Sequence, residues 1–240
     1  MVQKAVPEGP AKESRPARTS ARERLLLAAN ELFYAEGVQS VGIDRVIEHA
    51  GVAKASLYNC FGSKESLVRA YLDYRRERSV DRITRVLTRF RTPRERLLGM
   101  FDAQGELITS PGYNGCAFAA ASAEAPRGGS VEKATDEYRA WMRGLFAELA
   151  AEAGVADPQG LARQLHLLYD GATLSSQLDR DPTAASVARE AAAVLVDAAP
   201  KVAPADGEAA TPVSDAAAAA NIAKLAIDAD LGRVRPGTPG

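Results

Sequence analysis

The sequence predicts an all-α protein with about nine helices. Apolar residues recur at three- and four-residue spacings in nearly every segment, and no stretch alternates with period two for long enough to be a strand. Serine, aspartate, glycine and proline residues divide the chain into segments of helical length. Together these patterns predict a small N-terminal helical unit followed by a larger helical domain.

Composition and charge limit the function classes. The chain has 240 residues and is 46% hydrophobic, which is enough for one large domain or two small ones with a sizeable core. Residues 1–90 hold 16 Lys/Arg against 11 Asp/Glu, and residues 91–240 hold 14 against 20. The basic first part indicates an anionic partner at that end, with chance asymmetry as the alternative. Two cysteines provide neither a disulfide framework nor a metal-binding spacing, and no apolar run is as long as a membrane span. We therefore expect a cytoplasmic protein with no membrane partner, no metal and no cofactor.

The first elements are expected to be short. Residues 1–19 are polar and contain three prolines, which predicts a disordered basic arm. Ser20, with a glutamate three residues later, is expected to cap a helix that Gly37 ends. A second helix is expected over residues 43–50 and a third over about 53–59, each followed by a glycine stop.

The later elements are longer. Ser63 is expected to cap a fourth helix that reaches about Phe90, and Pro93 to open a fifth that ends near Thr109. A short apolar segment, residues 116–123, comes next. Three more helices are expected to end near residues 153, 178 and 199, with starts marked by Ser130, by Asp157 and Pro158, and by Asp181 and Pro182. The expected organisation is an arm (1–19), a first helical unit (20–66), a larger helical domain (67–199) and a mostly disordered tail (200–240).

The stretch 50–67, AGVAKASLYNCFGSKESL, predicts a helix-turn-helix. The turn at Gly51 and Val52 is too tight for side-by-side packing, so the two short helices must cross steeply and the second is presented outward. Small residues let such a helix approach a groove closely, lysine and hydroxyl groups reach phosphates, and serine and asparagine bond base edges. The alternative is a small helical bundle that merely has a polar face, and spacing alone does not separate the two. The outward face carries Lys54, Ala55, Ser56, Tyr58 and Asn59.

The run from Gly37 to Asp73 resembles the DNA-binding domain of the tetracycline-repressor (TetR) family of transcriptional regulators. The resemblance rests on Ala50, Gly51, Val52, Lys54, Leu57, Tyr58, Phe61, Ser63, Lys64, Glu65 and Leu67, which match the family pattern in order and spacing. The sequence departs from that pattern at Gly42, Ile47 and Cys60, where the family often has threonine, alanine and an aromatic residue. The resemblance implies a ligand-responsive regulator, more often a repressor, that a small-molecule effector releases from a palindromic double-stranded DNA operator.

The resemblance also implies roles for single residues. Tyr58 and Lys64 are expected to contact phosphates, and Lys54 to contact a phosphate or a base. The departure at Gly42, where the family's threonine can touch a phosphate, is expected either to weaken one backbone contact or to move it to Ser40 or Arg45. For Tyr58 the alternative is packing against the fourth helix, and for Lys64 it is an ordinary surface position. The residues expected to face the major groove are Ala53, Ala55, Ser56 and Asn59; for Asn59 the alternative is a solvated helix end.

One helix of this length reads only four or five base pairs, so two copies related by a two-fold axis are expected to read a palindrome. The resemblance implies that the last two helices of each chain form a four-helix homodimer bundle. The alternative is that their apolar faces complete the chain's own core. The expected interface residues are Leu161, Leu165, Leu168, Ala172, Val187, Ala191, Val194, Leu195 and Ala198.

The resemblance places an effector pocket in the second domain. The alternative is that aromatic residues at helical spacing there are ordinary core, and that the histidine is a hydrogen-bonded interface residue. The candidate lining residues are Phe101, Leu107, Phe118, Trp141, Met142, Phe146, His166 and Tyr169.

Two rival classes fit parts of the sequence. An enzyme is poorly supported because the phosphate-binding, dinucleotide-binding, zinc-hydrolase and nucleophile-elbow motifs are all missing, and the two histidines, His49 and His166, lie in different predicted domains. A helical adaptor protein explains the helices but not the pattern between Lys54 and Lys64. Steep salt dependence of binding indicates phosphate contacts and separates DNA binding from an apolar protein interface.

Overall fold

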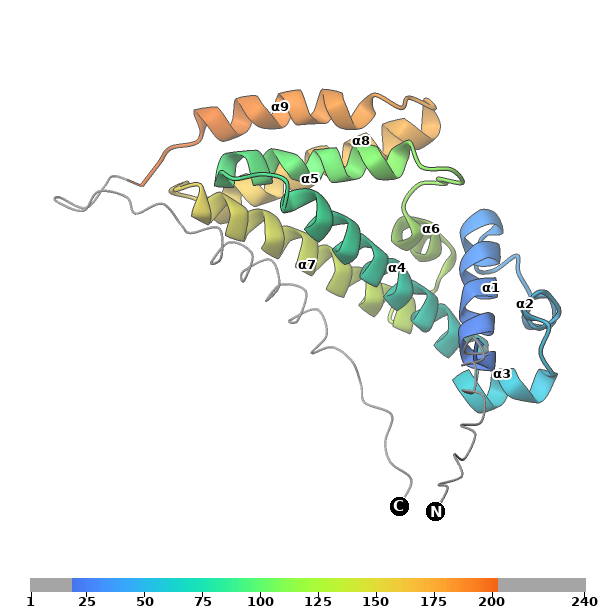
Figure 1. The fold of residues 1–240 in the computed structure, drawn as a ribbon. Coiled ribbons are helices and arrows are strands. Elements are labelled where there is room, and N and C mark those ends of the chain that lie inside the picture. The colour runs from blue at the N-terminus through green and yellow to red at the C-terminus, as the bar shows by residue number, and fades with distance from the viewer. Residues whose placement is uncertain (1–18, 203–240) are drawn as a thin grey trace, which may run out of the picture.

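The protein folds as a bundle of α-helices, shown in Figure 1. A computed structural model describes residues 19–202, which contain nine helices and one isolated β-bridge between Val155 and Lys201. The predicted all-helical class is confirmed. The arm before residue 19 and the tail after residue 202 lie outside the described residues. The helices are α1 (Ala21–Glu36), α2 (Ile43–Ala50), α3 (Lys54–Phe61), α4 (Lys64–Leu87), α5 (Pro93–Ile108), α6 (Ala117–Glu124), α7 (Ser130–Glu152), α8 (Pro158–Leu178) and α9 (Ala184–Ala198).

Local capping chemistry sets several of these boundaries. The Ser20 hydroxyl accepts a hydrogen bond from the Glu23 N–H at 3.1 Å, and the Asp157 carboxylate caps α8 in the same way. At the start of α5, Thr92 and Glu95 form a complete capping box in which each side chain accepts from the other's backbone N–H. These bonds satisfy N–H groups that have no partner inside the helix.

Two predicted helix starts are wrong in detail. Ser130 is the first residue of α7 rather than its cap, which is Gly129. α9 begins at Ala184, because the Asp181 carboxylate accepts hydrogen bonds from the Thr183 N–H at 2.7 Å and the Thr183 hydroxyl at 2.6 Å. Asp181 therefore organises a turn before the helix. Helix ends elsewhere agree with expectation to within about three residues, which is the usual uncertainty of such boundaries.

Figure 1 shows α1, α2 and α3 as a small unit at one end of the molecule, with α4 leading away from it. α4 has 24 residues and is therefore about 36 Å long. Its second half packs against α5 and α7, which pack in turn against α8 and α9. Within residues 19–202, no helix combines the length and the apolar character that crossing a bilayer requires.

Two buried clusters form the core, and the first of them crosses the expected boundary between residues 66 and 67. The first joins α1, α2 and α3 to the start of α4, and it also includes Phe118 and Ala121 of α6 and Val131 of α7. The second lies among α4, α5, α7, α8 and α9. Tyr138 of α7 packs against both clusters. The core of the first unit therefore continues into α6 and α7 of the larger domain.

Candidate nucleic-acid interface

α3 is attached to the three-helix unit by one fully buried side chain and by the turn that precedes it. Leu57 is 0% exposed, and the Arg22 guanidinium lies over the half-buried Phe61 ring, 5.0 Å from its centroid. Gly51 ends α2 with φ 60°, a left-handed conformation that glycine adopts at little cost. The Arg24 guanidinium donates to the Gly51 carbonyl at 3.2 Å. These contacts orient α3 with its remaining face outward.

The outward face of α3 carries the residues that the sequence predicts for DNA. Tyr58 is 46% exposed, so packing against α4 does not account for it. Ser56 and Lys64 are half-buried, Lys64 at the first position of α4 behind the Ser63 cap. Their contacts with DNA remain predictions. Exposed on this surface are Ala53, Lys54, Ala55, Tyr58 and Asn59, with Arg45 on neighbouring α2.

Two of the cationic residues predicted to contact DNA, Lys54 and Arg45, form ion pairs with carboxylates of the same chain. The Lys54 ammonium lies 2.8 Å from Asp44 Oδ1, and this hydrogen bond raises the pKa of Lys54. The Arg45 guanidinium pairs with both carboxylate oxygens of Glu36. All four side chains are exposed, so these pairs contribute little to stability and a phosphate can replace the carboxylate. The sequence reading missed both acids, although Asp44 lies only one residue before Arg45.

The positive charge of the first part of the chain lies beside the three-helix unit rather than in it. Residues 20–66 hold five Lys/Arg against six Asp/Glu. Residues 67–90 hold seven arginines against three acids, and residues 1–19 hold four Lys/Arg against two glutamates. Along the sequence, the net positive charge that favours a phosphate backbone therefore falls on residues 1–19 and 67–90.

α6 and the loop before it are hydrogen-bonded to α1, and Figure 1 shows α6 beside α1. The Tyr34 hydroxyl donates to the Gly115 carbonyl at 2.9 Å and accepts from the Asn114 N–H at 2.8 Å, while the Asn114 amide donates to the Tyr34 carbonyl at 2.8 Å. The Gln39 N–H donates to Glu124 Oε2 at 2.7 Å. We call these residues the α1–α6 contact. The sequence carried no signal for it, because the partners are at least 80 positions apart.

Most of the predicted effector-pocket residues are buried, in two neighbouring groups. In the first, the ring centroids of Phe101, Phe146 and Tyr169 are 6.0 Å apart in each pair. Met142 and His166 belong to the same buried region, whereas Leu107 is only half-buried. The second group is a stack in which Phe118 lies 4.0 Å from the Tyr138 ring, which lies 5.8 Å from Trp141.

Buried polar groups without partners lie in the same domain. Gln104, 1% exposed, donates from its amide to the Tyr169 carbonyl at 2.7 Å and to the Thr173 hydroxyl at 2.8 Å. Within the described residues, its Oε1, the Arg82 Nε and the Trp141 Nε1 find no hydrogen-bond partner. Burial raises the pKa of Tyr169 to about 12, although the Arg82 guanidinium opposes that effect. Because unsatisfied buried polar groups are costly, they mark a place where a bound molecule can supply partners. Sequence reasoning missed Gln104 and Arg82.

His166 gives a pH-dependent prediction. It is 5% exposed, and burial lowers its pKa even though nearby Asp170 raises it. The folded state therefore keeps the imidazole neutral while the unfolded chain protonates near its ordinary value of 6.5. Stability from this group is present above about pH 6.5 and falls with acidification, by up to about 1.4 kcal/mol per pH unit. Urea unfolding from pH 7.5 to 5 is expected to show a steeper decline for wild type than for His166→Gln; equal slopes would exclude this role.

The expected dimer residues divide between the chain's own core and its surface. On α8, Leu161, Leu165 and Ala172 are at most 5% exposed and Leu168 is half-buried, so this face completes the protomer's own core. The expectation for α8 was therefore wrong. The half-buried Leu195 of α9 also packs against the core. The other expected residues of α9, which are exposed, are Val187, Ala191, Val194 and Ala198.

A different apolar stripe of α8 is exposed. Leu167, Leu174 and Leu178 are 74%, 56% and 70% exposed, and on α9 Val187 and Val194 are 59% and 68% exposed. On each helix the spacing corresponds to one face. Exposed apolar stripes of this extent are unusual on a monomer and are typical of an association surface.

Known proteins resemble this chain over its first helices and, in some cases, well beyond them. A model of the tetR family of bacterial regulatory proteins matches residues 25–71. The HTH-type transcriptional activator FasR of Mycolicibacterium smegmatis is 34% identical over 98 residues, 40% of this chain and 45% of FasR. This chain thus spans less than half the length of FasR. The HTH-type transcriptional regulator YjdC of Escherichia coli is 26% identical over 152 residues, 62% of this chain and 80% of YjdC.

Solved structures resemble the whole helical part. SCO4454, a TetR-family transcriptional regulator from Streptomyces coelicolor, is 34% identical, with a TM-score of 0.66 over 74% of this chain and 92% of its own. The sav143 transcriptional regulator of Streptomyces avermitilis is 32% identical, with a TM-score of 0.68 over 76% of this chain and all of its own. The likeness therefore includes the larger helical domain as well as the three-helix unit.

Proposed function

Because this chain belongs to the TetR family of bacterial transcriptional regulators, we propose that it acts as a homodimeric repressor that a small-molecule effector releases from a palindromic operator. DNA binding and transcriptional regulation come with the family. The sign of regulation, the dimer and the effector are the parts proposed. The observation that carries the proposal is α3, which Leu57 anchors while Lys54, Tyr58 and Asn59 stay in solvent.

Two copies of α3 are needed for a specific operator. One copy reads too few base pairs to discriminate, whereas a two-fold dimer places two reader helices about one DNA turn apart, roughly 34–36 Å. The exposed stripes of α8 and α9 supply the dimer surface in this proposal. We define this dimer face by Leu167, Leu174, Leu178, Val187 and Val194. Pairing the two stripes with their two-fold copies would bury the face in a four-helix arrangement.

The effector is proposed to bind among the buried polar groups of the larger domain. Gln104 Oε1 and Arg82 Nε lack partners, and the side chains of both residues lie beside Tyr169. An effector that satisfies these groups has different affinities for two arrangements of α4 to α8, and that difference is what shifts the equilibrium. The α1–α6 contact and α4 would then carry the shift to the reader helix.

The test is selection of bound DNA from a random duplex library at about physiological salt. Enrichment of one palindrome is expected. A reporter gene placed behind that sequence then measures the sign of regulation, since repression predicts higher expression in a strain that lacks the protein. Because FasR is named an activator, lower expression in that strain would replace the repressor with an activator. Folded protein that enriches no sequence, with or without added metabolite extracts, would contradict the proposal.

The α1–α6 contact gives a second prediction. Tyr34→Phe removes the hydroxyl that serves both the Gly115 carbonyl and the Asn114 N–H. The unfolding free energy is expected to fall by about 1–2 kcal/mol, because two partly buried groups lose their partner. Urea unfolding measures this, with Tyr74→Phe on α4 as the matched control. Operator affinity is expected to fall with Tyr34→Phe and not with Tyr74→Phe; an equal effect of both would show that the contact does not position the reader.

A further inference from the structure

A cavity lies between the end of α4, α5 and the start of α9. Its volume is about 540 Å³, within the range of small-molecule sites. Apolar surface comes from Phe90, Phe101 and Ala185, and the rim includes Arg89, Glu106 and Ser186. Phe101, whose ring packs on Phe146 and Tyr169, also lines this cavity from α5.

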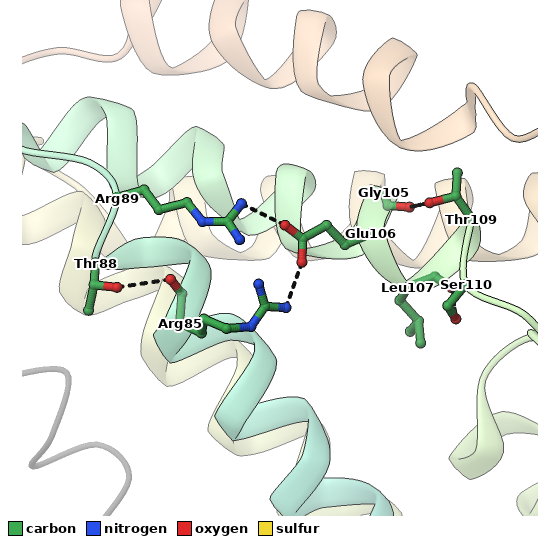
Figure 2. Close-up of polar contacts among 8 residues, drawn as sticks. All are labelled: Arg85, Thr88, Arg89, Gly105, Glu106, Leu107, Thr109 and Ser110. Atoms are coloured by element: carbon green, nitrogen blue, oxygen red, sulfur yellow. Dashed lines mark hydrogen bonds and ion pairs between the residues drawn. The ribbon is translucent and has the colours of Figure 1, made fainter.

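Arg89 and Glu106 line the cavity, and Figure 2 shows the Arg85 and Arg89 side chains meeting at the Glu106 carboxylate. The Arg85 guanidinium donates to Glu106 Oε2 at 2.7 Å, and the Arg89 guanidinium donates to Glu106 Oε1 at 2.6 Å. The hydrogen bond from Arg85 is the largest cause of the lowered pKa of Glu106. One carboxylate thus faces two guanidinium groups, which leaves an excess of one positive charge. The other ion pair beside the cavity, Arg189 with Asp102, is neutral overall.

We propose that this cavity binds an amphipathic organic anion. Its carboxylate, sulfonate or phosphate head would be held by Arg89, which lines the cavity, and by Arg85, which reaches the same place through Glu106. Its apolar body would lie against Phe90 and the edge of Phe101. Guanidinium groups bind such heads with paired hydrogen bonds, and each arginine here has donors beyond the one that Glu106 occupies. A cation is disfavoured by the local charge.

Space for the ligand body exists at Gly105. A Cβ built there would meet only the Ala185 Cβ, at 3.7 Å, which is ordinary contact. Gly105 lines the cavity, so the space that a longer side chain would occupy there is open to a ligand. A larger side chain at Gly105 would fill the cavity without touching the charged groups.

The consequence concerns α4, and it rests on the proposed function. The Glu106 pair holds the last turn of α4 to α5, while the first turn of α4 follows the reader helix. An anion that competes with Glu106 for the two arginines would loosen this attachment. Because α4 is a single helix of 24 residues, a change of tilt at its end is carried along its length to the reader.

The binding test uses a matched pair of fluorescent probes, 8-anilinonaphthalene-1-sulfonate and its neutral analogue N-phenyl-1-naphthylamine. The sulfonate is expected to bind the full-length protein at a 1:1 ratio per chain. The Arg85→Gln/Arg89→Gln double variant is expected to weaken sulfonate binding about 10-fold or more and to change binding of the neutral probe less than twofold. Glu106→Gln is expected to tighten sulfonate binding several-fold, since it frees both arginines. Opposite signs in two variants exclude simple misfolding as the cause.

Two further variants locate the probe. Gly105→Leu is expected to abolish binding of both probes by filling the cavity, whereas Leu174→Ser on the dimer face is expected to leave sulfonate binding unchanged. Loss of binding with Leu174→Ser but not with Gly105→Leu, or an equal response of both probes to the arginine changes, would overturn the proposal. Because these measurements need no DNA, they test anion binding in the cavity independently of the proposed repressor function. If the sulfonate probe binds but does not change the operator affinity of the wild-type protein, the regulatory consequence is wrong and the anion site remains.

Discussion

Leu174→Asp is expected to convert the protein from a dimer to a monomer and to lower operator affinity at least about 100-fold. Leu174 is 56% exposed and lies in the middle of the apolar stripe of α8, between Leu167 and Leu178. In a two-fold interface each chain contributes the same stripe, so one substitution places two carboxylates in the buried surface. Without the dimer, each reader helix binds its half-site alone, and the gain from linking the two binding events is lost.

Light scattering after size-exclusion chromatography measures the mass, and fluorescence anisotropy measures binding to the selected palindrome. Val202→Asp is the matched control, because Val202 is 64% exposed but lies beyond the end of α9. The control is expected to remain dimeric with unchanged affinity. A Leu174→Asp protein that stays dimeric would mean that another surface mediates association. A monomer with full operator affinity would show that dimerisation is not needed for reading DNA.

The second large effect is expected at the reader itself. Tyr58→Ala and Lys64→Ala are each expected to weaken binding to every DNA sequence by a similar factor, about 10-fold to 100-fold. Each change is expected to remove a proposed phosphate contact, twice in the proposed dimer. Tyr58 is exposed on α3 and Lys64 lies at the start of α4, so neither removal opens a large cavity in the core. For Lys64→Ala the slope of log affinity against log salt should become shallower by about one per subunit.

Substitutions at Ser56 and Asn59 separate positioning from reading. Ser56→Ala and Asn59→Ala are expected to change which sequences are selected while affinity for unrelated DNA stays nearly constant. Repeating the library selection with each of the four variants measures both properties. A uniform loss on every sequence for all four would contradict the division between phosphate and base contacts. A shifted sequence preference with Tyr58→Ala would assign that residue to base reading.

The local sequence was enough to predict α3 and the side chains on its outward face. Gly51 and Gly62 end α2 and α3, and Leu57 is the one residue of α3 that is fully buried. Spacing along one short helix decides which side chains point inward, since residues three and four apart share a face. The all-helical class and most helix boundaries follow from the same short-range rules of periodicity and capping. Ser130 and Asp181 show the limit, because several polar residues near a helix start compete to cap it.

The exposed face of α8 and the partners of Tyr34 and Gln104 depend on which distant segments pack together in the fold. α8 has apolar residues on two faces, so its sequence alone could not tell whether Leu165 or Leu167 packs inside the protomer; the fold buries Leu165 completely and leaves Leu167 74% exposed. The partners of Tyr34 in the α1–α6 contact are about 80 positions away, and those of Gln104 are 65 and 69 positions away. The sequence by itself thus determined the helices, the reader and its outward side chains, because each depends on neighbours within a few residues. Only the tertiary structure decided which apolar stripes stay exposed on α8 and α9, which groups form the α1–α6 contact and which side chains line the cavity beside Glu106. Each of these is made by side chains that folding alone brings together.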